Sequence, residues 1–219
     1  MIGKTVLVIG RDGGIAGAVV DAVRAAGGTA ILAGRNAGEK VDITDEASVA
    51  TLAARFDGID HVVSTASARA RGTAADLNPA TVLASFHTKV IGPLLLAKHF
   101  TLPPDGSFVF FSGASAAKAM PGMLAVGATN AAVDTLTRGL AVELAPIRVN
   151  AISPGTIDTG AYDALGEEKK ASLFATRTTT NPARRIGTTA DVATAVLYAL
   201  TNTFVTGTTL QVDGGEPLV

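Results

Sequence analysis

Cysteine is absent from this sequence, and histidine is scarce. Without cysteine the chain has no disulfides, no thiolate nucleophile and no cysteine-ligated zinc site. The three histidines, His61, His87 and His99, do not share the close spacing of metal-binding motifs. We therefore expect no metal centre.

The sequence also has no excess of one charge and no long hydrophobic run. Its 18 basic and 19 acidic residues give a net charge of −1, so it lacks the basic footprint of a nucleic-acid-binding protein. No stretch of about 18 uncharged apolar residues is present, so a membrane span is not expected. The first residues do not resemble a signal peptide, and we expect a cytoplasmic protein.

What is present is the composition of one globular domain. Of the 219 residues, 47% are hydrophobic and 17% are charged, which is too apolar for a disordered chain. This length suits a single domain that spans residues 1–219.

Short apolar segments alternate with helical patterns along the chain. Strands are predicted at 4–9, 29–33, 41–43, 60–64, 107–111, 148–152 and 208–212. Helices are predicted at 14–27, 45–56, 79–100, 123–144 and 191–200, with Thr44 as an N-cap and a bend at Gly92-Pro93. Because the strands are nearly all apolar, we expect an α/β fold, a Rossmann-like doubly wound parallel sheet with helices on both faces. The irregular stretch 154–187 is long for a loop, so we expect it to contain a short helix and to form a substrate lobe or lid.

The turn after the first predicted strand is rich in glycine. It runs Gly10-Arg11-Asp12-Gly13-Gly14 and leads into the first helix. Glycines at such a turn let the backbone approach a pyrophosphate, and the free N–H groups of the helix N-terminus favour its charge. A plain tight turn is the alternative interpretation.

Four stretches of the chain resemble the short-chain dehydrogenase/reductase family of single-domain Rossmann oxidoreductases. They are the glycine turn Gly10-x-x-x-Gly14-Ile15-Ala16, the segment LAVELAPIRVNAISPG at 140–155, the segment PARRIGTTADVA at 182–193, and Thr206-Gly207 followed by VDGG at 212–215. Together they span nearly the whole chain. The resemblance implies a nicotinamide dinucleotide cofactor and a small-molecule substrate. It also implies a homo-oligomer, a tetramer or a dimer, that pairs through the helices at 79–100 and 123–144.

The family's catalytic residues are missing from this chain. Family members use a Ser, a Tyr-x-x-x-Lys pair and a helix Asn, with the tyrosine as general acid or base. Aligned on the flanking motifs, these positions fall on Gly113, Val126, Asn130 and Lys89. Neither of the two tyrosines is followed by a lysine four residues later, so a shift of register does not restore the pair. Valine cannot protonate an alkoxide, and the family's catalytic roles therefore do not carry over.

Other polar groups are expected near this centre. They follow the fifth predicted strand, lie on the helix at 79–100, or follow the sixth strand. The candidates for catalysis are Ser112, Ser115, Lys118, His87, Lys89 and Tyr162. Each also has a purely structural interpretation, as a loop hydrogen bond, a packing side chain or a solvated charge.

Arg35 decides which cofactor we expect. An acid after the second strand binds the ribose 2′-hydroxyl of NAD, whereas an arginine accommodates the 2′-phosphate of NADP. The strand here leads into Arg35 and not into an acid, so NADP(H) is expected, with Arg11 as a second cation. A surface cation is the alternative interpretation of Arg35. The other expected cofactor contacts come from the glycine turn and the resemblance: Gly10, Gly14, Ile15, Asp42, Ile43, Ser64, Thr65, Ala66, Asn130, Pro154, Gly155, Ile157 and Thr159.

Two functions stay open. The first is an NADP(H)-dependent oxidoreductase that acts on a small carbonyl- or imine-type substrate with a non-standard proton donor. The second is a redox-inactive NADP(H)-binding protein, either a sensor, a scaffold or a non-redox enzyme. The cofactor frame favours the first function, and the loss of four catalytic groups favours the second.

Overall fold

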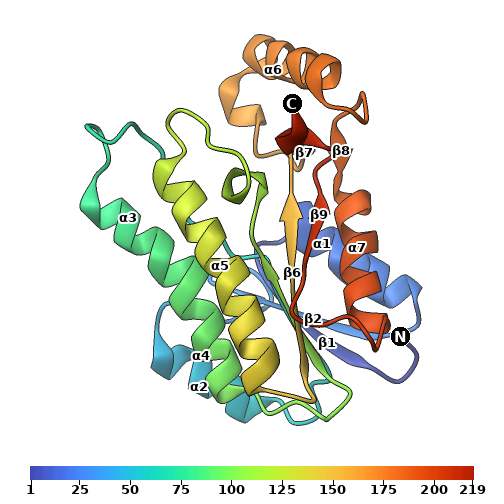
Figure 1. Cartoon of the computed structure of the whole chain (residues 1–219). Coiled ribbons are helices and arrows are strands. Elements are labelled where there is room, and N and C mark those ends of the chain that lie inside the picture. The colour runs from blue at the N-terminus through green and yellow to red at the C-terminus, as the bar shows by residue number, and fades with distance from the viewer.

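Seven parallel strands form the central sheet in the computed structural model, which describes residues 1–219 (Figure 1). The strands are β1 (Thr5–Ile9), β2 (Thr29–Gly34), β3 (Glu39–Lys40), β4 (His61–Ser64), β5 (Ser107–Phe111), β6 (Arg148–Pro154) and β9 (Thr209–Val212). Their order is β3-β2-β1-β4-β5-β6-β9, and every pair is parallel. The predicted doubly wound α/β sheet is confirmed.

Alternate side chains of each strand face the two helical layers. Val6 and Val8 of β1 pack with α1 (Gly14–Ala25) and α7 (Thr189–Thr201) on one face. Leu7 and Ile9 pack with α2 (Glu46–Arg55), α4 (Gly92–His99) and α5 (Leu124–Glu143) on the other. Burial on both faces explains why the strands are nearly all apolar.

The long helix predicted at 79–100 is present, but its irregularity lies earlier than expected. It consists of α3 (Pro79–Phe86), a π-helical turn at His87–Ile91, and α4. Pro93 has no N–H to donate and its ring needs space in the preceding turn. The widened turn just before it relieves this conflict without a break in the helix. The same turn directs Lys89 into the protein, where its side chain is buried.

The segment Pro79–His99 is also long and apolar enough to cross a membrane, by length and composition only. Core helices of water-soluble proteins pass the same test, so this is weak evidence for a span. Lys89 in its middle lines a cavity, and α3 packs beside α5.

Two local predictions around α2 are wrong by one or two residues. The third strand is Glu39–Lys40 and not 41–43, because the backbone of Glu39 pairs with Ala33, while Val41 enters the core as a packing side chain. The N-cap is Asp45 and not Thr44. The Asp45 carboxylate accepts the N–H of Ala47 at 3.0 Å, whereas the Thr44 hydroxyl donates to Asp42 at 2.7 Å.

The stretch 154–187 contains more structure than a short helix. It holds the short strand β7 (Ile157–Asp158), a 3₁₀ turn (Asp163–Leu165), the helix α6 (Glu167–Thr180) and the short strand β8 (Gly187–Thr188). No residue of α6 is buried, and α6 projects over the carboxyl ends of the strands at the top of Figure 1. The pairing of β7 with β8 closes the base of this lobe.

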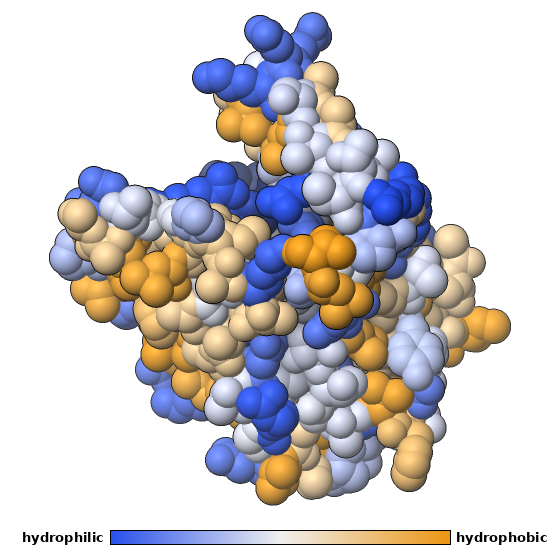
Figure 2. Space-filling view, turned by 45° about the horizontal axis from the view of Figure 1, so that its top comes forward, coloured by the Kyte–Doolittle hydropathy of each residue, from blue (hydrophilic) through white to orange (hydrophobic).

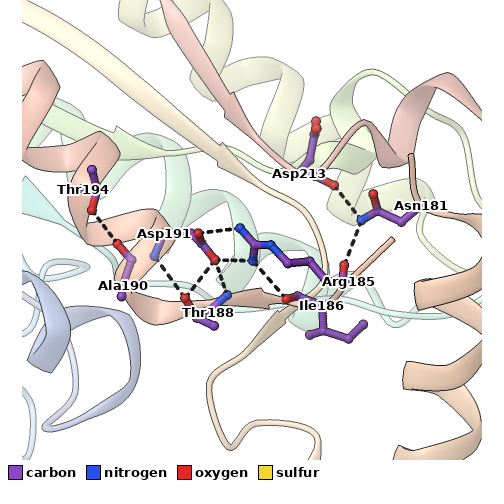
Figure 3. Close-up of polar contacts among 8 residues, drawn as sticks. All are labelled: Asn181, Arg185, Ile186, Thr188, Ala190, Asp191, Thr194 and Asp213. Carbon is purple, nitrogen blue, oxygen red and sulfur yellow. Dashed lines mark hydrogen bonds and ion pairs between the residues drawn. The ribbon is translucent and has the colours of Figure 1, made fainter. Parts of the chain in front are cut away.

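A cluster of polar contacts fixes the second end of the lobe to the sheet and to α7 (Figure 3). The Arg185 guanidinium donates two bonds of 2.7 Å to the Asp191 carboxylate. Asp191 also accepts the N–H and the hydroxyl of Thr188, which completes a capping box on α7. The pKa of Asp191 is therefore held far below its usual range, first by Arg185 and next by the Thr188 N–H. Asn181 reaches the carbonyl of Asp213 beside β9.

Candidate active site

Two adjoining cavities lie at the carboxyl ends of the strands. The first, of ≈ 640 Å³, surrounds the glycine turn after β1 and the ends of β2 and β4. The second, of ≈ 510 Å³, lies between the loops after β4 and β5, the helix α5 and the lobe. Ile15, Thr65, Ser67 and Arg69 line both. The strand order reverses between β1 and β4, which is where open α/β sheets bind ligands. Figure 2, tipped so that the top comes forward, shows a hollow beside the projecting lobe with hydrophilic side chains along it.

The glycine turn presents an uncapped helix end to the first cavity. Gly13 and Gly14 have φ values of 84° and 55°, which favour glycine. The N-cap of α1 is Gly13, and no side chain caps the first turn, whereas Asp45, Asn78 and Thr188 cap α2, α3 and α7. A Cβ on Gly13 would meet no atom within 4 Å. The free N–H groups of α1 therefore face open space that suits a pyrophosphate.

Gly10 serves a different purpose from Gly13. A Cβ at Gly10 would lie 2.3 Å from the Thr65 hydroxyl oxygen and 2.7 Å from the Ala16 Cβ. Thr65 itself is fixed by bonds from its N–H and its hydroxyl to the carbonyl of Ile9. Gly10 thus allows α1, β1 and the loop after β4 to meet closely at the floor of the cavity.

The predicted adenine and phosphate contacts lie together around this cavity. Arg35 lines it without a salt-bridge partner and is exposed. Asp42 accepts two hydrogen bonds from Thr44, which hold the pKa of its carboxyl below the usual range, and the charge of Arg35 adds to this effect. The Arg11 guanidinium donates to the carbonyl of Thr159 at 2.7 Å, so it connects the glycine turn to the lobe. Nine of the predicted cofactor contacts line this cavity: Gly10, Arg11, Ile15, Arg35, Asp42, Ile43, Thr65, Ala66 and Thr159.

Some predicted site residues lie outside both cavities. His87 is exposed on the π-helical turn, because that turn directs Lys89 inward instead. The side chain of Ile157 packs into the core against α7, and Ser64 is buried at the end of β4. Gly14 lies beneath the Arg11 guanidinium. Pro154, Gly155 and Asn130 line the second cavity and not the first.

Lys89 is the centre of a buried polar network in the second cavity. Its side chain is 6% exposed, and its ammonium group donates to the Ser112 carbonyl at 3.2 Å and to the Asn130 side-chain oxygen. The Asn130 amide donates in turn to the Ser115 hydroxyl at 2.8 Å. The Ser112 hydroxyl donates to the backbone carbonyl of Asn130 at 3.1 Å. Lysine, asparagine and serine are thereby held in one hydrogen-bonded chain.

Burial changes the acidity of Lys89. Loss of hydration lowers its pKa from the usual 10.5 to about 7, and the charge of Arg69 acts in the same direction. Asp134 opposes this shift as the smallest cause. An amine with a pKa near neutrality exchanges a proton readily at neutral pH, which is the property of a general acid or base.

Lys89 and Asn130 contact each other from two different helices. Alignment on the flanking motifs predicts that Lys89 stands in the family's asparagine position and Asn130 in its lysine position, and this alignment stays a prediction. A Cβ on Gly113, the predicted serine position, would lie 2.8 Å from the Asn130 amide nitrogen. Asn130 in its present rotamer therefore excludes a serine at 113, and Ser115 supplies the hydroxyl group beside Asn130 instead.

The remaining catalytic candidates also lie in the second cavity. Lys118 and Tyr162 line it, together with Ser112 and Ser115. The Tyr162 ring packs edge-on against Phe174 of α6 at a centroid distance of 5.5 Å, so the tyrosine belongs to the lobe. Val126, the predicted tyrosine position, is buried and lines the cavity wall.

Sequence reasoning missed four charged residues of the second cavity. They are Arg69, Arg71, Arg177 and Glu216. The pair Arg69-x-Arg71 in the loop after β4 was a visible signal for the first two. Arg177 of the lobe and Glu216 of the C-terminal turn form an ion pair of 3.0 Å. The two residues are far apart in the sequence, so no local sequence pattern predicts this pair.

Comparisons with known proteins agree with this architecture. The sequence matches a family model described as enoyl-(acyl carrier protein) reductase over residues 9–216. It is 31% identical to the short-chain dehydrogenase/reductase malC of Malbranchea aurantiaca over 97% of this chain and 94% of malC. It is 30% identical to the short-chain reductase protein NovJ of Streptomyces niveus over 98% of this chain and 85% of NovJ. A solved small-chain dehydrogenase in complex with NADPH superimposes with a TM-score of 0.93 at 32% identity, over 99% of both chains. With its parallel sheet, its uncapped glycine turn and these matches over nearly its whole length, the chain belongs to the short-chain dehydrogenase/reductase family.

Proposed function

We propose that this protein is an NADP(H)-dependent oxidoreductase that acts on a small carbonyl- or imine-type substrate, with Lys89 as the proton donor. One observation carries the proposal: a buried amine with a pKa of about 7 lies in the cavity that adjoins the glycine-turn cavity. Similarity to a dehydrogenase solved with NADPH supports the cofactor.

Each residue of the network has a defined task in this proposal. Bound NADPH supplies the hydride that reduces the carbonyl or imine carbon. Lys89 in its ammonium form gives a proton to the substrate oxygen or nitrogen, and Asn130 orients that amine through its side-chain oxygen. Ser115 fixes the Asn130 amide, and its hydroxyl oxygen keeps the amide in the orientation that accepts from Lys89. Tyr162 and the lobe around α6 cover the site and exclude water.

Two measurements in sequence test the function. NADPH binding is followed by the fluorescence of the reduced cofactor, and NADPH oxidation is then followed by absorbance with a panel of aldehydes, ketones and imines. We expect binding and turnover of at least one carbonyl or imine class. Binding without oxidation of any panel member would instead favour a redox-inactive sensor or a non-redox enzyme. Absence of NADPH binding would contradict both functions.

Arg35 is expected to give a preference for NADPH over NADH. It lines the first cavity without a carboxylate partner, so its guanidinium is available for a 2′-phosphate. Because such a charged hydrogen bond contributes about 1.5–3 kcal/mol, Arg35→Ala should weaken NADPH binding about tenfold or more and leave NADH binding nearly unchanged. Titration of both cofactors against both proteins checks this. Equal affinity of the unmodified protein for NADPH and NADH would contradict it.

The proposed assembly is a homo-oligomer, most simply a tetramer, that pairs through the helical segment Pro79–His99 and α5. These helices carry large apolar side chains that are exposed in the single chain, such as Leu83 at 60%, Leu124 at 61% and Val142 at 79%. Contact with a second copy would bury them, and two-fold pairing is the commonest arrangement. Light scattering is expected to give a mass of several chains of 22.0 kDa, most simply that of four chains. A mass of one chain at micromolar concentration would contradict the assembly.

A further inference from the structure

The second cavity is positively charged although the chain is not. Its lining includes Arg69, Arg71, Lys118 and Arg177 in addition to Lys89, and its single carboxylate is Glu216. The whole chain has a net charge of −1. Cations are therefore concentrated around this cavity, and a cleft of one sign raises the local concentration of ligands of the opposite sign.

The single carboxylate is fully engaged and neutralises only one of these cations. One oxygen of Glu216 pairs with Arg177 at 3.0 Å. The other accepts the N–H of Thr156 at 2.9 Å and its hydroxyl at 3.0 Å. Arg69, Arg71 and Lys118 form no salt bridge with any carboxylate of the chain. Their charges are therefore available to a ligand.

Arg71 and Lys118 come to the same cavity from two loops that are joined together. Gly72, next to Arg71, donates its N–H to the Gly122 carbonyl at 2.9 Å, and Gly72 also bridges to Met123. This contact connects the loop after β4 to the loop after β5, which carries Lys118. Arg69 lines both cavities, whereas Arg71 and Lys118 line the second cavity alone. These two cations therefore lie away from the glycine-turn cavity, where the pyrophosphate is expected.

We infer that the substrate is an anionic carbonyl or imine compound whose acid group is bound by Arg71 and Lys118. This inference rests on the proposed function, because it takes the second cavity as the substrate site. Guanidinium and ammonium groups bind carboxylates and phosphates through strong charge-assisted hydrogen bonds. The carbonyl lies at Lys89, deeper in the cavity, and an apolar body packs against Met120, Val126 and Leu173. The substrate class is therefore an acid with an apolar segment between its acid group and its reactive carbon.

Binding of three matched probes tests this inference without any need for turnover. They are 4-oxo-4-phenylbutanoate, its methyl ester, and the phosphonate with the same skeleton. Each is titrated calorimetrically into the protein with saturating NADP⁺ and, separately, without it. We expect at least one acid to bind about tenfold or more tightly than the ester, since one charge-assisted contact contributes about 1.5–3 kcal/mol. Which acid binds more tightly distinguishes a carboxylate from a phosphate ligand. Equal binding of acids and ester, or no binding of any probe, would overturn the inference.

Paired variants locate the effect. Arg71→Gln with Lys118→Gln is expected to remove the acid preference and to leave ester binding within about threefold. Lys169→Gln with Arg184→Gln is the matched control, because it removes two cations from the lobe region that do not line the cavity, and it should keep the preference. Retention of the preference in the first pair would overturn the assignment. If the acid probes bind more tightly than the ester but no carbonyl or imine of the turnover panel is reduced by NADPH, the proposed function alone is contradicted. If neutral carbonyls are reduced but acids and ester bind equally, this inference alone is contradicted.

Discussion

Replacement of Lys89 by methionine is expected to lower turnover about 10²- to 10⁴-fold, with NADPH affinity within a few-fold of the unmodified protein. Methionine has a similar length and no proton to give. Lys89 is not among the predicted cofactor contacts and does not line the glycine-turn cavity, so its loss should remove the proton donor and leave the predicted cofactor contacts in place. Steady-state kinetics of NADPH oxidation, together with a fluorescence titration of NADPH, measures the two effects separately.

The pH profile separates proton donation from a structural role. Because the pKa of Lys89 is lowered to about 7, the ammonium form is depleted as the pH rises through that value. Reduction by the unmodified protein should therefore fall above neutral pH, and the residual activity of Lys89→Met should lack this fall. Methionine also leaves the Ser112 carbonyl and the Asn130 side-chain oxygen without their donor, so the unfolding temperature of the variant is measured alongside to separate a loss of stability from the loss of the proton donor.

Lys118 and Tyr162 provide matched comparisons in the same cavity. Lys118→Met should act mainly on KM for anionic substrates, and Tyr162→Phe should change turnover less than tenfold. A large loss of kcat in Lys118→Met or Tyr162→Phe, with little loss in Lys89→Met, would show that Lys118 or Tyr162 is the proton donor and Lys89 is not. If none of the three variants lowers activity more than tenfold, no side chain among them donates the proton, and a water donor or a redox-inactive role replaces the proposal.

The strands, and the helices on both faces of the sheet, could be predicted because strands buried on both faces appear in the sequence as short, continuous apolar segments. The segment SFVFF at Ser107–Phe111 is buried throughout, and its predicted bounds agree with the structure. The third strand had no such pattern, because a two-residue edge pairing at Glu39–Lys40 is made by backbone groups and not by apolar side chains. The π-helical turn likewise arises from the steric conflict between Pro93 and the preceding helical turn. The spacing of apolar residues does not depend on this conflict, so it could not predict the turn.

The lining of the first cavity was predictable where the chain order places residues at strand ends. The glycine turn, Arg35 and Asp42 follow strands directly, and parallel strands bring such positions to one edge of the sheet. His87 was misplaced because its position relative to Lys89 depends on the widened turn. The contact of Lys89 with Asn130 joins positions that are 41 residues apart, so only the folded helices reveal that the two side chains meet.

At the other end of the sheet, mild acid is expected to destabilise the protein through His61. This side chain is 3% exposed at the start of β4, and its Nδ1 lies 2.9 Å from the Ser107 hydroxyl oxygen. Burial first, and the charge of Arg148 second, lower its pKa from 6.5 to about 4. Between these values the unfolded chain binds a proton that the folded chain does not. The free energy of unfolding should therefore fall as the pH decreases from about 6.5 to about 4, by about 3 kcal/mol in total.

Urea unfolding at a series of pH values across this window measures the slope, and two variants assign it. His61→Gln keeps a hydrogen-bonding side chain beside Ser107 but cannot be protonated, so most of the slope should disappear. His87→Gln changes an exposed histidine and should retain the slope. The carboxyls of Asp42 and Asp105, whose pKa values are lowered by Thr44 and by Lys4 respectively, add their own loss of stability only as the pH falls further. A flat profile between pH 6.5 and 4 in the unmodified protein, or an unchanged slope in His61→Gln, would show that the buried imidazole does not control acid stability.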